Sequence, residues 1–175
     1  MRFIFGFIFF LFLSVRANAQ FLQIEIPVKS YLQTEIQQRL IVQNRRSGEG
    51  HYVIPLESAE TGIYTVRSFQ NQLIRVQISS VIFLHHINPA VKDSLMMKIK
   101  AAYNNQNAEK TWESNLFKDH SARFKIYDSG LHTEEKTKDE SIWKTTYIYL
   151  FGKLNVGLVE PGLYTGKLKM RIEYL

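Results

Sequence analysis

Apolar and polar residues alternate along most of this chain, and no other feature of the sequence restricts the fold as strongly. A period of two is the spacing at which successive side chains point to opposite faces of a β-sheet. In residues 73–78, for example, Ile74, Val76 and Ile78 alternate with Leu, Arg and Gln. The same alternation recurs almost to the C-terminus, so the sequence predicts a protein built from strands.

The expected strands of the first half are short and are separated by clusters of turn-forming residues, such as residues 44–50 and 70–72. These strands are residues 22–28, 40–42, 51–55, 62–66 and 73–78. Pro27 has no N–H to give to a ladder, so the first strand is expected to end, or to lie at a sheet edge, near that residue.

Residues 95–103 fit two patterns. The odd-numbered residues are apolar, as in a strand, but a helix over residues 91–103 would also collect an apolar stripe. We favour the strand, because the neighbouring segments are strands and Asn104-Asn105 offers a turn.

Short strands also dominate the C-terminal third. We expect strands at residues 122–127 and 145–151 and a charged loop over residues 128–144, and Gly152 permits a bend or bulge before Leu154 and Val156. The last strand follows the Pro161-Gly162 turn. Its two faces are Tyr164, Leu168, Met170, Ile172 and Tyr174 on one side, and Lys167, Lys169, Arg171 and Glu173 on the other.

About nine short strands without a convincing long helix predict an all-β fold, an antiparallel immunoglobulin-like β-sandwich. We find neither an internal repeat nor a domain boundary, so residues 20–175 are expected to form a single domain.

The first nineteen residues have the composition of an export signal. Met1-Arg2 is followed by an apolar run over residues 3–15, and Ala17-Asn18-Ala19 supplies the small residues of a cleavage site. A membrane anchor is the alternative, but thirteen apolar residues rise only about 20 Å as a helix, whereas the hydrocarbon core is roughly 30 Å thick. We therefore expect a signal peptide over residues 1–19, and a protein that is periplasmic, at the cell surface or secreted.

The exported chain is only mildly basic. Loss of Arg2 and Arg16 reduces 22 basic residues to 20, which against 16 acidic residues leaves a net charge of +4. We expect no nucleic-acid partner, and at most a weak attraction to anionic glycans or membrane surfaces. No segment after residue 19 is long and apolar enough to suggest a transmembrane helix, and the chain has no cysteine for a disulfide or a thiol-linked lipid.

No pattern of catalytic or metal-binding residues stands out. His85 and His86 are adjacent, so on a strand their rings would point to opposite faces and could not share a metal ion. The chain has neither a Gly-x-Ser-x-Gly turn nor a cysteine nucleophile, and the carboxylate pairs near residue 135 lie among lysines. We expect no catalytic residues, no metal site and no cofactor.

The C-terminal third resembles a known bacterial family. Residues 146–156, then residues 161–168, then an alternating terminal strand are similar to the endings of the domain-of-unknown-function family numbered 4402, which is related to spore coat protein U and fimbrial subunits. The matching positions are Gly152, Leu154, Val156, Gly162, Tyr164 and Gly166. The resemblance implies an exported β-sandwich.

The end of the chain also resembles that of chaperone–usher pilus subunits. Tyr174 is penultimate, Leu168, Met170 and Ile172 alternate before it, and Gly162 is the fourteenth residue from the end. In that resemblance the terminal strand takes part in strand addition, in which an exposed edge gains main-chain hydrogen bonds from a partner. The alternative is an ordinary last strand, because any strand of a sandwich alternates.

A second apolar row lies at the start of the exported chain. This row comprises Leu22, Ile24, Ile26 and Val28. It is either the protein's own first strand or a donor arm for a neighbouring molecule.

Together these features suggest a non-enzymatic exported surface subunit, fimbria-like and structural or adhesive, which assembles through β-strand contacts. Its expected partners are like subunits or a periplasmic chaperone, and surface glycans. The alternative is a monomeric periplasmic or secreted module that binds a glycan or a peptide. The absence of a catalytic pattern disfavours an enzyme.

Overall fold

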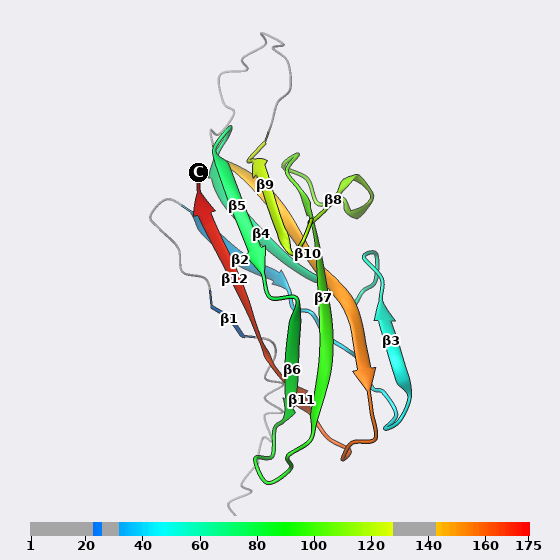
Figure 1. The fold of residues 1–175 in the computed structure, drawn as a ribbon. Coiled ribbons are helices and arrows are strands. Elements are labelled where there is room, and N and C mark those ends of the chain that lie inside the picture. The colour runs from blue at the N-terminus through cyan, green and yellow to red at the C-terminus, as the bar shows by residue number, and fades with distance from the viewer. Residues whose placement is uncertain (1–22, 26–31, 128–142) are drawn as a thin grey trace, which may run out of the picture.

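The protein folds into two β-sheets packed face to face, as Figure 1 shows for a computed structural model that describes residues 23–25, 32–127 and 143–175. The strands are β1 Gln23–Glu25, β2 Gln33–Gln38, β3 Gly50–Ile54, β4 Gly62–Phe69, β5 Leu73–Ile78, β6 Val81–His86, β7 Ser94–Asn104, β8 Asn115–Leu116, β9 Ser121–Lys125, β10 Trp143–Val156, β11 Tyr164–Thr165 and β12 Lys167–Tyr174. A 3-10 turn, η1, spans Thr111–Glu113. The expected signal peptide and most of the charged loop lie outside the described residues.

The smaller sheet has four strands in the order β1-β12-β5-β9. β5 pairs antiparallel with both β12 and β9. β1 pairs parallel with β12, and it contacts only the first three residues of that strand, Lys167 to Lys169.

The larger sheet has eight strands, six of them in the order β11-β6-β7-β10-β4-β2. Its centre is the long strand β10, which pairs with β7 on one side. On the other side β10 pairs with β4 over residues 143–150 and with β3 over residues 152–156. β8 adds to β7 beyond the end of β6. All of these pairs are antiparallel.

The core lies between the two sheets, where alternating residues of facing strands meet. The buried side chains of the smaller sheet include Ile74, Val76, Ile78, Phe124, Leu168, Met170 and Ile172, and those of the larger sheet include Val66, Met97, Ile99, Ile148, Leu150 and Leu154. Two contacts join the sheets directly. The Tyr103 and Phe124 rings stack at 4.0 Å between centroids, and the hydroxyls of Ser68 and Tyr174 are 2.7 Å apart.

The middle of β10 is buried on both faces. Ile148 and Leu150 point into the core, while Tyr149 and Phe151 lie on the outer face and are also buried. The segment after β7 runs beside Tyr149. The Asn104 side chain holds this segment in place by donating a hydrogen bond to the Lys110 carbonyl at 3.1 Å. This burial agrees with the apolar residues that the sequence places on both faces of β10.

The prediction of an all-β protein with antiparallel sheets is confirmed. β5 has the predicted bounds and the predicted buried face, and residues 95–103 form a strand, not a helix. β10 continues through Gly152 to Val156 without a bulge in its ladder with β7, and it begins at Trp143, inside the expected loop. Gly152 has φ +154°, and a side chain there would collide with the Lys98 carbonyl oxygen of β7.

Two other strand predictions need correction, and one strand was not predicted. Residues 40–42 are not a strand, and the strand of that region is the polar β2, which ends at Gln38. β6 was not expected. The C-terminal strand is divided at Gly166, since Thr165 pairs with the larger sheet and Lys167 begins the smaller one. A side chain at Gly166 would crowd Leu84 and the Phe83 carbonyl, so glycine allows the chain to change sheets there.

Candidate functional site

The terminal strand β12 presents the two faces that the sequence predicts. Leu168, Met170 and Ile172 are buried, whereas the basic side chains between them are exposed. Tyr174 is half-buried, and its hydroxyl reaches Ser68 of β4. Four of the expected assembly residues, Leu168, Met170, Ile172 and Tyr174, therefore share one strand and one face.

The other two expected assembly residues lie in a different place. Tyr164 is in β11 of the larger sheet, and Gly162 lies in the connection just before that strand. Gly162 lies against the His86 ring, which leaves no room for a side chain at that position. Tyr164 meets the same ring edge-on at 5.1 Å and donates a hydrogen bond from its hydroxyl to the Glu160 carbonyl at 2.7 Å. Gly162 thus has a packing role that the terminal-strand pattern did not suggest.

Only one residue of the predicted donor arm can be placed. Ile24 lies in β1, opposite Leu168 in the parallel ladder. Leu22, Ile26 and Val28 lie outside the described residues. The pairing of β1 with β12 of the same chain is one of the two arrangements that the sequence left open.

Among the described residues, β12 is paired along only part of its outer edge. β5 pairs with the half from Met170 to Tyr174, but on the opposite side β1 pairs only with Lys167 to Lys169. Within the described ranges, no strand pairs with that side of Met170–Tyr174. An uncovered strand edge exposes a row of main-chain donors and acceptors, which is a template for another strand.

An apolar groove opens at the end of the sandwich where β6 and β11 lie, far from the C-terminus in Figure 1. Its volume is about 430 Å³. Its floor is the inner face of the larger sheet, with Ile82, Leu84, Leu95, Met97, Leu154 and Val156. The four-stranded sheet does not extend over this area, so two connections form the walls, residues 40–47 and residues 159–166.

The two walls are joined at one end of the groove. The Ser47 hydroxyl donates a hydrogen bond to the Val159 carbonyl at 2.8 Å and accepts one from the Val159 N–H at 2.9 Å. The Gly48 N–H donates to the Gly157 carbonyl at 2.8 Å. These bonds fix the first wall onto the C-terminal part of the chain, 112 residues away in the sequence for Ser47 and Val159.

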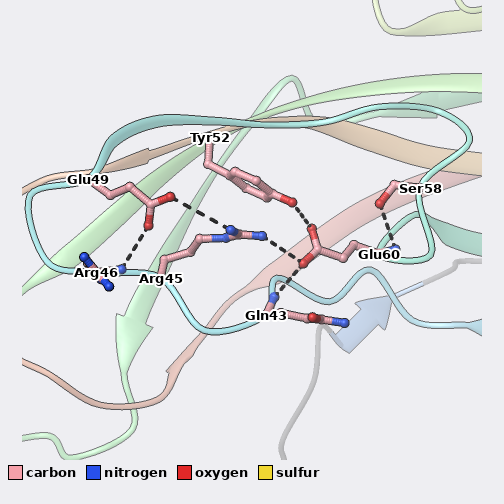
Figure 2. Close-up of polar contacts among 7 residues, drawn as sticks. All are labelled: Gln43, Arg45, Arg46, Glu49, Tyr52, Ser58 and Glu60. Atoms are coloured by element: carbon pink, nitrogen blue, oxygen red, sulfur yellow. Dashed lines mark hydrogen bonds and ion pairs between the residues drawn. The ribbon is translucent and has the colours of Figure 1, made fainter.

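Glu60 anchors the same wall from inside, as Figure 2 shows. Its carboxylate accepts hydrogen bonds from the Gln43 N–H at 2.9 Å and from the Tyr52 hydroxyl at 2.6 Å. Arg45 completes the cluster, with Nη2 3.2 Å from Glu60 Oε1 and its guanidinium 3.4 Å from the centroid of the Tyr52 ring. Glu60 is only 6% exposed, so these partners compensate for the removal of its charge from water.

The partners of Glu60 also set its protonation state. Burial by itself would raise the pKa of Glu60, but the hydrogen bonds from Tyr52 and Gln43 and the positive charge of Arg45 outweigh it and hold the pKa below its ordinary value. The same carboxylate raises the pKa of Tyr52. Both carboxylate oxygens of Glu60 therefore have partners and anchor the wall, whereas the buried Nε of Arg45 has no hydrogen-bond partner among the described residues.

The sequence did not suggest Glu60 or the groove. A lone glutamate between Ala59 and Thr61 carries no pattern, and Leu40-Ile41-Val42 was interpreted as a strand because it is apolar. In the structure this tripeptide contributes side chains to the groove instead.

No metal-binding group appears in the part of the chain that the structure describes: three or more His, Cys, Asp or Glu side chains nowhere come together. His85 is exposed and His86 is half-buried, on opposite faces of β6 as expected. The described residues also contain no helix long and apolar enough to cross a membrane.

Comparisons with protein-family profiles, with curated proteins and with solved structures found no match.

Proposed function

We propose that this protein is an exported, non-enzymatic surface subunit, fimbria-like and structural or adhesive, that assembles through β-strand contacts with like subunits or with a periplasmic chaperone. The observation that carries the proposal is the incomplete cover of β12. The side chains of Leu168, Met170 and Ile172 are buried in the core, while half of one main-chain edge has no paired strand among the described residues.

The geometry of β1 supports assembly by exchange of a strand. β1 is paired parallel with β12 over three residues, which is a small contact to break. A second molecule that supplies the same strand would restore every hydrogen bond that is lost, and exchange of an identical element is a low-cost route to an oligomer. The N-terminal row of Leu22, Ile24, Ile26 and Val28 is long enough to extend along the uncovered half of β12.

The test compares the size of two forms of the chain, residues 20–175 and residues 29–175, by sedimentation velocity over a range of concentrations. On this proposal the longer form associates and the shorter form does not. The shorter form should capture a peptide of residues 20–29 added in trans, and the peptide with Ile24→Asp and Ile26→Asp serves as the matched control. Two stable monomers of equal shape, neither of which binds the peptide, would contradict the proposal.

A second function is favoured by the apolar groove. A monomeric periplasmic or secreted module could use this groove to hold an apolar peptide segment, because its floor is six aliphatic or Met side chains and its walls are fixed by Ser47 and Glu60. The same sedimentation experiment separates the two functions, since this module stays monomeric. A larger side chain on the floor, as in Leu84→Trp, would then block peptide binding without changing the size of the protein.

A further inference from the structure

A second hollow lies on the outer face of the larger sheet, where β2, β4 and β10 run side by side (Figure 1). Its volume is about 580 Å³. The strand register arranges its floor in rows. Gln33, Arg67 and Thr145 form one row across the three strands, and Glu35, Thr65 and Tyr147 form the next. This face points away from the core and from β12.

Several polar groups of this floor make no hydrogen bond within the fold, although the Arg67 guanidinium lies over the Trp143 ring, 6.0 Å from its centroid. Gln33, Glu35 and Arg67 are exposed, and none of their side chains makes a hydrogen bond or an ion pair to another described residue. Asn107, at the margin, is held in place because its side-chain oxygen accepts a hydrogen bond from the Thr145 N–H at 2.8 Å. Its amide nitrogen donates to no other residue in the described ranges. Donors and acceptors of both kinds are thus available to a ligand.

Two aromatic rings border these groups. Trp143 is half-buried and packs on Phe69, with 4.4 Å between ring centroids, while Tyr147 is half-buried in the row below. Both belong to β10, which pairs with β4 at Trp143 and with both β4 and β7 at Tyr147, so the backbone under the rings is held by neighbouring strands. A flat aromatic face beside amide, carboxylate and guanidinium groups is complementary to a sugar ring, which has C–H bonds on its faces and hydroxyls around its rim.

The charge of the hollow indicates which kind of sugar it would accept. One cation, Arg67, and one anion, Glu35, line it, so its two charged side chains balance. The other half of the same outer face is different, because Lys98, Lys100 and Lys153 are all exposed there. A polyanion would be attracted to the lysines, whereas the balanced hollow suits a neutral ligand with many hydroxyls.

We propose that the outer face of β2, β4 and β10 is a binding site for a neutral oligosaccharide, with Trp143 and Tyr147 against the faces of the sugar rings and Gln33, Glu35, Arg67 and Asn107 on their hydroxyls. This site goes beyond the proposed assembly function, since it lies on the other sheet from β12 and needs neither an uncovered edge nor an oligomer.

The chain offers a built-in reporter for this site. It has two tryptophans, and Trp112 is 71% exposed and does not line the hollow. The full chain with Trp112→Phe therefore reports on Trp143 alone. Its fluorescence is titrated with maltohexaose, cellohexaose and N-acetylated chitohexaose as neutral probes, and with an oligogalacturonate as an anionic probe. We expect a saturable change with at least one neutral probe.

Variants test whether the binding is in the hollow. Tyr147→Ala removes a ring contact and should weaken binding about tenfold, the loss typical of an aromatic anchor. The double variant Gln33→Ala/Glu35→Ala changes only exposed side chains of an edge strand, so it tests the site without threatening the core. Asn155→Ala, exposed on the outer face of the same strand β10, is the matched control and should bind normally. The proposal is overturned if no neutral probe gives a saturable change, if only the anionic probe does, or if the Gln33/Glu35 double variant binds like the control.

Discussion

Glu60 shows how one residue with no sequence pattern around it can decide the shape of a site. Its carboxylate accepts hydrogen bonds from the Gln43 backbone and from two side chains, Arg45 and Tyr52, which lie against each other on the same side of it in Figure 2. Because hydrogen bonds to a charged group are stronger than those between neutral groups, this residue fixes the course of the chain along the groove.

Glu60→Gln is expected to destabilise the protein by about 2 kcal/mol at neutral pH, because the bonds from Arg45 and Tyr52 lose their charge-assisted character. The pKa of Glu60 is lowered in the folded protein, so its stabilising effect is present above the ordinary pKa of 4.5 and is lost as the pH falls below that value. Urea unfolding at pH 7 and at pH 3 checks this, since the parent and the variant should differ at pH 7 and converge at pH 3.

Glu57→Gln is the control for this prediction, because Glu57 is exposed three residues earlier in the same connection. It should leave the stability at both pH values unchanged. An equal gap between parent and Glu60→Gln at pH 7 and pH 3 would show that the charge of Glu60 does not stabilise the fold.

Substitution of Tyr149 is expected to change stability in the opposite direction from Glu60→Gln. It is fully buried, its hydroxyl makes no well-formed hydrogen bond to a described residue, and burial outweighs the effect of the nearby Lys110 backbone and raises its pKa to about 12. Tyr149→Phe removes a buried polar group without a partner, so we expect it to be neutral or to stabilise the protein by about 1 kcal/mol.

The same variant has a signature in alkali. Folding favours the neutral form of Tyr149. The free energy of unfolding of the parent is therefore unaffected by this group below pH 10 and decreases as the pH rises from 10 to 12. Tyr149→Phe should therefore unfold less readily at pH 11 than the parent, measured by urea titration at pH 8 and pH 11. A variant that is destabilised by more than about 1 kcal/mol at pH 8 would mean that the hydroxyl does have a partner.

At the scale of elements, the sequence predicted the strands that have one buried face. It did not predict the strands whose position depends on tertiary contacts. β5 and β12 alternate because one face is in the core. β2 is an edge strand of mostly Gln, Thr and Glu, so it has no apolar period to detect, and its place is set by pairing with β4. Residues 40–42 are apolar because they line a groove, which imitates the signal of a buried strand.

Two variants of β12 test its assigned faces. Ile172→Asp places a charge in the core, where Ile172 is 2% exposed, so we expect loss of several kcal/mol of stability, of protease resistance and of any assembly. Lys169→Ala changes an exposed side chain on the opposite face and should alter the free energy of unfolding by less than about 0.5 kcal/mol. The measurements are limited proteolysis and native size. If the two variants behaved alike, the facing of this strand would be wrong.

At the scale of the whole molecule, the two sheets are unequal, and the groove follows from that difference. Eight strands present a longer inner face than four strands can cover, so loops cover the remainder and leave about 430 Å³ between them. Periodicity predicts which residues face inward, but it does not say how far one sheet extends over another. The sandwich was therefore predictable from the sequence, whereas the groove and the outer hollow depend on strand order and register, which the sequence left open.

The last prediction concerns the weaker of the two layers. Deletion of residues 163–175 removes β11 and β12, so the smaller sheet loses the strand that joins β1 to β5, and the core side chains of the larger sheet face water. Leu168, Met170 and Ile172 each contribute roughly 1.5–3 kcal/mol by burial, the β12–β5 ladder adds to this, and a whole domain has only about 5–15 kcal/mol. We expect the truncated chain to be unfolded, with no near-ultraviolet circular dichroism and rapid digestion by protease. Deletion of Leu175 alone is the control, because this residue is 47% exposed and gives up only one backbone hydrogen bond, to Leu73. A truncated chain that kept a cooperative thermal transition would mean that the eight-stranded sheet is stable by itself, with β12 an addition to the fold and not one of its two walls.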